Sequence, residues 1–331
     1  MVRVNFIIED YKTLKYLGCS TAAKQFVDIL RNKGLELEVN SKKKDFDIIH
    51  AHTFGPQAIY RAHKNKNSIS IVSAHSTPSI NKGNILTGSF KIWNWIYSTI
   101  YNKFDYVLAV SENSVKELKD IGVKKEIFVV ENGVETKKFH YDKKRGVEFR
   151  ENNGIKKDDM VVLNVAQITP RKGVYDFIET AKKCPEIQFV WVGGFPYKYL
   201  SSDYFKLKKI TRKNAGLKNL KFTGFVSNIT GAYSGSDVLF TPSLAETFGL
   251  TIIEAGACKL PVIARELEVF RELFGEKIIY GKNTKDFTEL IKKFRENTFR
   301  EKQSKKAHLL SKKYDIKVIA EKLFNFYNEI A

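Results

Sequence analysis

The stretch Thr241–Arg265, TPSLAETFGLTIIEAGACKLPVIAR, decides the fold of this chain. Its pattern predicts a strand, a tight turn, a buried helix and a second strand. Seven residues separate two glutamates, with Glu246 in the turn and Glu254 inside the helix. Backbone N–H groups without helical partners at the helix start, residues 248–251, favour an anion. The stretch therefore predicts a place for a phosphorylated sugar, although an ordinary connection with two surface glutamates has the same local pattern.

The length and charge of the chain bound its class. A chain of 331 residues predicts two domains, and its 43% hydrophobic residues supply enough apolar material for two cores. The formal net charge of +19 suits an anionic partner, such as a nucleotide, a nucleic acid or an acidic membrane surface. A Lys-rich background with solvated charges gives the same balance.

The cysteines and the hydropathy pattern indicate the compartment. Cys19, Cys184 and Cys258 lie far apart without metal-ligand spacing, and the last two stand in apolar helical contexts that predict core positions. A disulfide framework is not expected, which favours a reducing cytosol. We find neither an apolar run of roughly 20 residues nor a signal peptide. The expectation is a cytoplasmic protein, soluble or peripheral on the inner face of the cell membrane.

Strands alternate with helices along the chain, which predicts an α/β fold. A first set of strands is expected at Val2–Ile8, Leu35–Val39, Asp47–His50, Ile69–Ala74, Tyr106–Val110 and Ile127–Val130. A second set, outside the opening stretch, is expected at Met160–Ala166, Phe189–Val192, Leu220–Phe222, Asp237–Thr241 and Ile278–Ile279. Two Rossmann-like domains of this kind, facing each other, form a cleft at the carboxyl ends of their strands, where ligands bind.

The segment Glu131–Val134 interrupts this alternation, and a charged stretch that looks poor in helix follows it to about Asp159. We therefore place the domain boundary after residue 135. The remainder from Lys285 to Ile330 is predicted to be helical and strongly charged.

Five motifs, in order along the chain, resemble those of glycosyltransferase family 4, whose members are retaining enzymes with the GT-B fold. They are the hinge Asn132–Glu135, the diphosphate loop Ile168–Gly173, the base-binding turn Phe222–Val226, the glutamate pair and the terminal helix Ser311–Ile330. The resemblance covers essentially the whole chain. It implies an acceptor domain over residues 1–135 and a nucleotide-sugar donor domain over residues 136–311. The terminal helix, residues 312–331, would cross back and pack on the first domain.

The resemblance also implies roles for the charged residues. Glu246 would contact hydroxyls of the donor sugar, and Glu254 would accept hydrogen bonds from both ribose hydroxyls. Lys172 and Arg171 would neutralise the diphosphate, on which negative charge grows as the sugar leaves. With His75, the residues Glu246 and Lys172 form the expected catalytic set. The remaining donor-binding positions would be Gly18, Gly224, Phe225, Val226, Phe248, Gly249 and Leu250.

Two positions in this assignment carry alternatives. His75 resembles the family's active-site histidine near the transferred sugar, but a histidine at a strand end can also simply bond a backbone carbonyl. The family commonly has an arginine five residues before the loop lysine, where this chain has Gln167. We expect Arg171 to supply that charge instead.

The sequence does not require a metal ion or a tightly bound cofactor. His50 and His52 have the spacing of a metal pair, but a third ligand is not apparent, and strand-end or acceptor-side roles are favoured. A catalytic carboxylate pair is not needed either, because in enzymes of this type the leaving diphosphate is thought to help deprotonate the acceptor.

The acceptor is suggested by the run from His75 to Glu112, which resembles that of bacterial diacylglycerol glucosyltransferases. Its aromatic and basic segment, residues 85–104, could lie in an anionic membrane interface or form a core helix with a broad apolar face. The chain is thus expected to transfer a hexose such as glucose from a nucleotide sugar such as UDP-glucose to a lipid such as diacylglycerol. A polysaccharide, glycoprotein or soluble sugar acceptor is the alternative. A nucleic-acid-binding protein, which the charge alone would allow, is not expected because the sequence has no matching motif.

Overall fold

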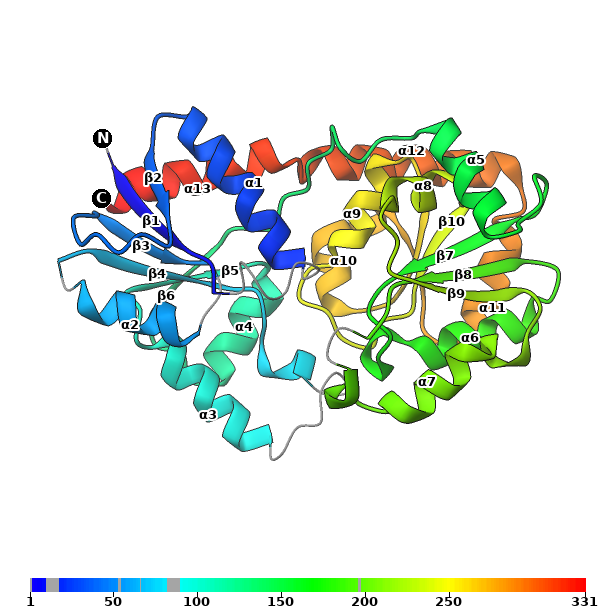
Figure 1. The fold of residues 1–331 in the computed structure, drawn as a ribbon, viewed down its shortest axis with the longest axis horizontal. Helices are drawn as coiled ribbons and strands as arrows, with labels where there is room; N and C mark the ends of the chain where they lie inside the picture. Colours follow the sequence, from blue (N-terminus) through cyan, green and yellow to red (C-terminus); the bar gives the residue numbers. More distant parts are fainter. Residues whose placement is uncertain (1, 10–17, 53–54, 66, 82–89, 196–197) are drawn as a thin grey trace. The chain divides into compact units, whose positions relative to one another are not determined.

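The computed structural model describes residues 2–9, 18–52, 55–65, 67–81, 90–195 and 198–331. These residues divide into two compact units (Figure 1). The first unit holds the described residues of Met1–Ser79, Thr87–Glu135 and Tyr314–Ala331, and the second holds those of Ile80–Leu86 and Thr136–Lys313. The chain therefore changes unit between Glu135 and Thr136, where the predicted boundary lies.

The first unit is a Rossmann-like layer structure. Its described residues form a six-stranded parallel sheet in the order β2-β1-β3-β4-β5-β6. The strands are β1 (Arg3–Ile7), β2 (Glu36–Val39), β3 (Ile48–Ala51), β4 (Ile69–Ala74), β5 (Tyr106–Ala109) and β6 (Glu126–Val129). Helices α1 (Gly18–Asn32) and α13 (Ile316–Ile330) cover one face, and α2 (Pro56–Lys64), α3 (Phe90–Tyr101) and α4 (Glu112–Asp120) cover the other (Figure 1).

The strand period of two assigns side chains to these faces. On β3, Ile49 and Ala51 enter the core cluster beneath α2, α3 and α4. The residue between them, His50, points to the opposite face, where it meets Tyr327 of α13. A histidine in an otherwise apolar strand is thus placed beside the last helix of the chain.

The terminal helix α13 is tied to the first unit. The amide of Val134 donates to the carbonyl of Tyr314 at 2.9 Å, and the amide of Ile316 donates back to the carbonyl of Val134 at 2.9 Å. Gly133 makes this approach possible, because a Cβ there would lie 2.7 Å from the Cα of Ile316. Helix α13 then packs along α1, which confirms the expected return of the terminal helix to the first domain.

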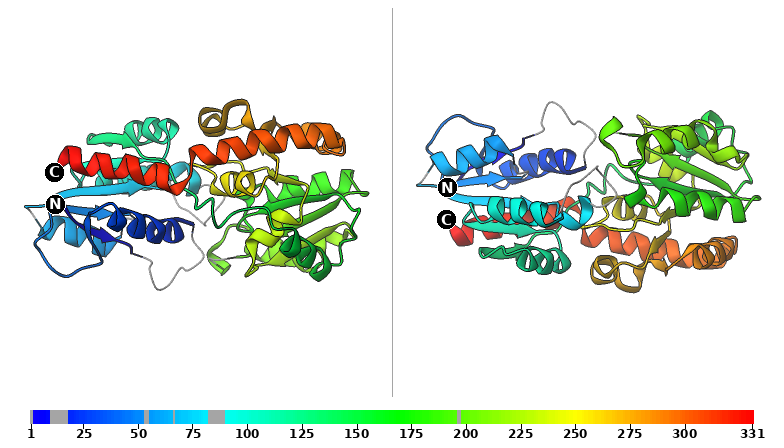
Figure 2. Two further views of the ribbon diagram at one scale, coloured as in Figure 1. Left: turned by 90° about the horizontal axis from the view of Figure 1, so that it is seen from above. Right: turned by 90° about the horizontal axis from the view of Figure 1, so that it is seen from below.

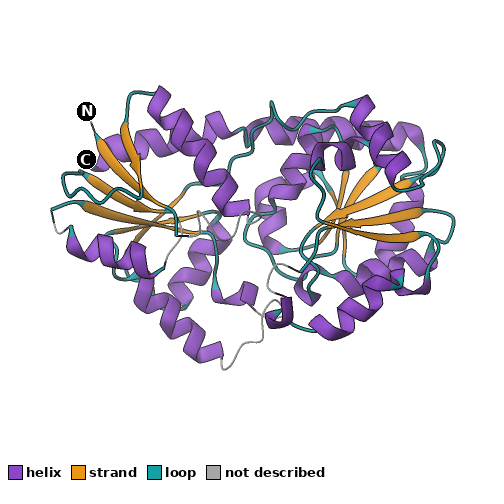
Figure 3. Ribbon diagram, in the orientation of Figure 1, coloured by secondary structure: helices purple, strands orange, loops and turns teal. Residues whose placement is uncertain are grey.

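The second unit repeats the architecture. Its described residues form a six-stranded parallel sheet in the order β12-β11-β10-β7-β8-β9. The strands are β7 (Val161–Val165), β8 (Gln188–Val192), β9 (Leu220–Gly224), β10 (Val238–Thr241), β11 (Val262–Arg265) and β12 (Ile279–Gly281). The helices are α5 (Lys143–Asn152), α6 (Val174–Lys183), α7 (Tyr204–Arg212), α8 (Ile229–Ser234), α9 (Leu250–Ala257), α10 (Glu268–Phe274), α11 (Thr284–Lys293) and α12 (Asn297–Lys313). They lie on both faces of the sheet, as Figures 2 and 3 show.

The core of the second unit is rich in aromatic side chains. Phe177 of α6 stacks on Phe240 of β10 at 5.6 Å between ring centroids and meets Trp191 of β8 edge-on at 5.2 Å. Leu207 of α7 and Phe287 of α11 complete the same cluster. This packing holds β7, β8 and β10 rigidly beneath the loops that follow them.

One prediction for this unit is wrong. The charged stretch that looked poor in helix contains α5, which buries Gly146 and Phe149. Gly146 lets the backbones of α5 and α8 touch, because a Cβ there would lie 2.7 Å from the carbonyl oxygen of Ser234. With so few buried apolar positions, α5 shows little of the periodicity that identifies a helix.

Cys184 and Cys258 are buried, as expected, whereas the side chain of Cys19 falls outside the described part. In the described ranges, none of the helices has both the length and the apolar composition needed to cross a bilayer.

Candidate active site

The central cluster of the second unit joins Glu246 to Arg171 and Lys172. Strands β7 and β10 are neighbours in the sheet, so the loops after them leave the same edge. Lys172 bonds one carboxylate oxygen of Glu246, and Arg171 Nη1 lies 3.3 Å from the other. Arg171 Nη1 also donates to the carbonyl of Ala245 at 2.7 Å. The three side chains are 8%, 19% and 11% exposed for Arg171, Lys172 and Glu246 respectively, so this is a largely buried ionic cluster.

Backbone geometry brings the two loops together. The amide of Leu244 donates to the carbonyl of Arg171 at 2.7 Å. Gly173 has φ 72°, in the left-handed region, and a Cβ there would lie 2.2 Å from the carbonyl oxygen of Pro242. Any side chain at Gly173 would therefore push the two loops apart.

The charges of the cluster set its protonation. Burial alone would raise the pKa of Glu246, but the positive charges of Lys172 and Arg171, with hydrogen bonds from Lys172 and Ser243, outweigh burial and lower this pKa to about 2. Burial lowers the pKa of Lys172, an effect that the charge of Glu246 opposes. At neutral pH Glu246 is a carboxylate that can only accept hydrogen bonds. The cluster can therefore bind hydroxyl groups through the carboxylate and an anion through the cations.

The loop that contains Gln167 and Arg171 has two buried polar atoms with unusual hydrogen bonding. The side-chain oxygen of Gln167 and the Nε of Arg171 are buried, and neither has a hydrogen-bond partner in the described part of the chain. Arg171 instead uses Nη1 on the β10 loop. Its contact with a phosphate remains a prediction.

Glu254 lies on α9, one turn into the helix that begins after Gly249 (φ 99°). The hydroxyl of Tyr233 donates to Glu254 Oε2 at 2.6 Å. Burial raises the pKa of Glu254, against the effects of Tyr233 and Lys138. Tyr233 is fully buried on α8. This contact was not predicted, because a tyrosine in an apolar helix looks like an ordinary core residue.

The other predicted donor positions lie along the same unit. Phe248 is buried, and its ring meets that of Phe274 edge-on. Gly224 (φ 73°) ends β9, and its carbonyl accepts from the amide of Gly193 at 2.8 Å. Phe225 is 51% exposed, and its ring lies against Gly194, where a Cβ would come within 2.8 Å of it. An exposed aromatic ring held in this way can stack on a nucleotide base. Val226 is partly exposed and Leu250 begins α9.

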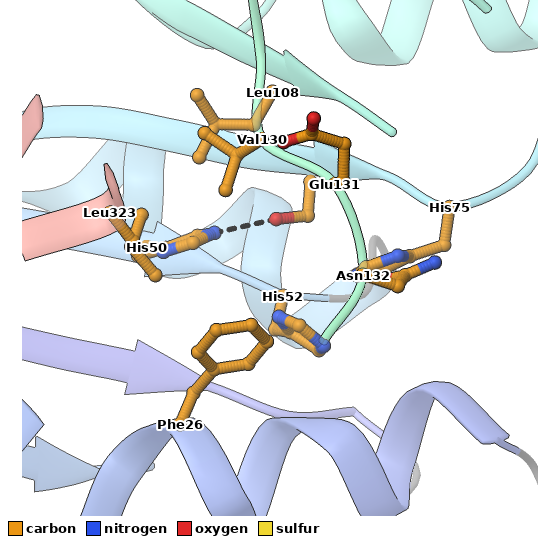
Figure 4. A pocket seen from close by; sticks show the side chains of 10 residues that line it. Phe26, His50, His52, His75, Leu108, Val130, Glu131, Asn132 and Leu323 are labelled. Carbon is orange, nitrogen blue, oxygen red and sulfur yellow. Dashed lines mark hydrogen bonds between the residues drawn. The ribbon is translucent and has the colours of Figure 1, made fainter. Parts of the chain in front are cut away.

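In the first unit, three histidines gather at the ends of β3 and β4 (Figure 4). The rings of His52 and His75 lie 4.3 Å apart between centroids. His50 bonds Tyr327 through Nδ1 and Ser73 Oγ through Nε2 at 2.8 Å. Burial lowers the pKa of His75 to about 4, against a hydrogen bond with Asn132. Burial, followed by the charge of His75, lowers that of His50 to about 3.

The imidazoles of His50 and His75 can therefore act only in their neutral form near pH 7. The two ring nitrogens of His50 are engaged in structural bonds, which supports the strand-end interpretation for this residue. In the ranges that the structure describes, His, Cys, Asp and Glu side chains form no group of three placed for a metal ion. Gly18 is the first residue of α1.

Two Rossmann-like units, each built on a six-stranded parallel sheet, are the architecture of the GT-B class of glycosyltransferases. The family described as "Glycosyl transferases group 1" matches residues 147–310, and the one described as "Glycosyltransferase Family 4" matches residues 29–138. The chain belongs to this glycosyltransferase family, in agreement with the resemblance of its motifs.

Two relatives and one solved structure illustrate the match. The chain is 30% identical to the processive diacylglycerol alpha-glucosyltransferase of Acholeplasma laidlawii over 270 residues, which are 78% of each chain. It is 25% identical to the alpha-galactosylglucosyldiacylglycerol synthase of Streptococcus pneumoniae over 341 residues, covering 100% of this chain and 90% of that one. The structure of Anabaena HepE in complex with UDP-glucose has the same fold, with a TM-score of 0.81 and 19% identity over 99% of this chain and 100% of that chain.

Proposed function

We propose that this glycosyltransferase is a retaining hexosyltransferase that transfers glucose from UDP-glucose to a lipid such as diacylglycerol at the cytosolic membrane face. The ionised Glu246 between Arg171 and Lys172 carries the proposal. A carboxylate for sugar hydroxyls beside cations for a diphosphate suits a nucleotide sugar. Two relatives named for diacylglycerol glycolipids and the UDP-glucose bound by HepE support the choice of acceptor and donor.

In the proposed reaction, the bond between the anomeric carbon and the diphosphate breaks. A new bond forms between that carbon and the acceptor oxygen, on the face from which the diphosphate leaves. The acceptor proton passes to the departing diphosphate, and UDP is released. Lys172 and Arg171 stabilise the charge that develops on the phosphate, Glu254 binds the ribose, and neutral His75 contacts the sugar. The proposed reaction includes no step on a metal ion or a tightly bound cofactor.

The lipid acceptor is supported by α3. Tyr97 and Tyr101 of this helix are buried in the core, so the core-helix alternative holds for one face. The opposite face exposes Ile92 by 56% and Trp95 by 68%, beside the exposed Lys91. Exposed aromatic and basic side chains suit an anionic bilayer surface.

A screen of nucleotide sugars by thermal shift, followed by product analysis with lipid extracts, tests the reaction. We expect UDP-glucose to raise the melting temperature and an α-glucosyl lipid to form, also in the presence of EDTA. A β-linked product would refute retention. Transfer to soluble sugars but not to lipid would favour the alternative acceptors.

Flotation with vesicles containing phosphatidylglycerol tests the membrane surface. Trp95→Ser should reduce vesicle binding, whereas Leu309→Ser, which removes a 59% exposed apolar side chain from α12, should not. Equal binding by both variants would refute the role of α3.

A further inference from the structure

Arg265 makes hydrogen bonds to three segments of the second unit, one of which is the loop that carries Glu246. It is the last residue of β11, and its side chain is 15% exposed. Its Nε donates to the carbonyl of Pro242 at 3.1 Å, its Nη2 to Asp176 at 2.7 Å and its Nη1 to the carbonyl of Lys282 at 2.7 Å. A planar guanidinium can satisfy three such acceptors at fixed angles, which a lysine cannot do.

The hydrogen bond from Arg265 to Pro242 connects Arg265 to the candidate active site. Its carbonyl oxygen faces Gly173, the residue directly after Lys172, so closely that a Cβ there would lie 2.2 Å away. The β10 loop runs from this carbonyl to Glu246. By holding Pro242, Arg265 fixes the base of the loop that carries the carboxylate against the loop that carries its cation.

The Nη2 side of the Arg265 guanidinium is held by residues of α6 and α11. Asp176 lies in the first turn of α6 and also accepts a hydrogen bond from Thr284 Oγ1 at 3.3 Å. The guanidinium of Arg265 lies over the ring of Phe287, 5.2 Å from its centroid, and that ring belongs to the core cluster. The loop is thus fixed relative to α6, to α11 and to the sheet together.

We propose that Arg265 is a positioning residue for glycosyl transfer, which sets the placement of Glu246 relative to Lys172. This inference rests on the proposed role of Glu246 at the donor sugar. A displacement of about 1 Å in a reacting geometry can lower a rate by about 100-fold. Loss of Arg265 should therefore reduce kcat more than it weakens UDP binding, because Glu254 lies inside α9, which α12 holds in place through the close packing of Gly256 on Ala307.

Arg265→Met tests the proposal, with Arg265→Lys as the conservative variant. Arg271→Met is the matched control, because Arg271 lies nearby on α10, pairs with Glu266 and Glu276, and covers the ring of Tyr280 at 4.0 Å. Four quantities are measured: kcat, the donor KM, the UDP dissociation constant and hydrogen exchange of the Leu244 amide, which is bonded to Arg171.

For Arg265→Met we expect kcat to fall by about 10- to 100-fold, the UDP dissociation constant to stay within about threefold, and the Leu244 amide to exchange faster. Arg265→Lys should recover part of kcat, and Arg271→Met should match the unsubstituted protein. If Arg265→Met does not fold, Asp176→Ala removes the acceptor of Arg265 Nη2 and should give a smaller change in the same direction.

Equal kcat and equal exchange in the Arg265 and Arg271 variants would overturn the proposal, as would a loss of kcat without faster exchange. The exchange measurement needs no donor. If the unsubstituted protein transferred no sugar while Arg265→Met still accelerated exchange at Leu244, the positioning of the loop would stand and the proposed function would fail.

Discussion

Glu246→Gln should change how the stability of the second unit depends on pH. The substitution keeps the shape of the side chain and removes its charge, which leaves Lys172 and Arg171 without their carboxylate. The pKa of Glu246 falls from 4.5 to about 2 on folding. A depressed carboxylate pKa stabilises the folded state above the unfolded-state pKa, and this contribution is lost as the pH falls through the folded-state pKa.

The size of the effect follows from the shift. Each pKa unit corresponds to about 1.4 kcal/mol, so the ionised Glu246 contributes about 3 kcal/mol to the free energy of unfolding at neutral pH. About 2 kcal/mol of this should be lost between about pH 5 and about pH 3. Glu246→Gln should lack that part of the pH dependence, and should also unfold more easily at pH 7 because two buried cations lose their partner.

Urea unfolding at a series of pH values measures the free energy of unfolding of the unsubstituted protein and of Glu246→Gln. Replacing Trp93 and Trp95 by Phe leaves Trp191, which is fully buried in β8, as the single tryptophan reporter of the second unit. The difference in unfolding free energy between the two proteins should shrink as the pH falls from about 5 to about 3. A difference that stays constant over this range would show that Glu246 is not held in an ionised cluster.

The remaining predictions concern binding and catalysis. Glu254→Ala should weaken UDP binding itself, and Tyr233→Phe should weaken it by less, because one hydrogen bond to a carboxylate contributes about 1.5–3 kcal/mol at most; calorimetry showing unchanged affinity in both would contradict the ribose role. Glu246→Ala should slow transfer far more than it weakens UDP binding, and equal losses would place its contact elsewhere than on the sugar. Gly173→Ala should lower both the melting temperature and kcat, since its methyl group would meet Pro242, whereas wild-type values would show that the loops can separate without cost.

The fold could be predicted because its strands are short apolar runs separated by helices. Val161–Val165 and Gln188–Val192 have the composition of strands covered on both faces, and the structure places both inside the second sheet. Helices with little apolar periodicity could not be predicted from the sequence. Helix α5 is the example, since it packs through a glycine and one phenylalanine and not through an apolar stripe.

The members of the central cluster were predicted, but their mutual contacts were not. Lys172 and Glu246 are 74 positions apart, and only the neighbouring places of β7 and β10 in the sheet bring them together. Tyr233 and Arg265 escaped prediction for the same reason. Each acts through a partner far away in the sequence. Tyr233 lies in none of the motifs, and Arg265, although it ends the opening stretch, was predicted there only as the end of a strand.

Helix α13 has a consequence for how the protein is made. The first unit contains Tyr314–Ala331, and His50 in its sheet needs Tyr327 as a partner. All of Thr136–Lys313 leaves the ribosome before that helix does. At about 5–20 residues per second, the first unit waits roughly 10 to 35 seconds for its last helix, while the second unit can already fold. Residues 1–135 thus leave the ribosome before the second unit, but the α13-facing side of their sheet stays uncovered until the second unit has been synthesised.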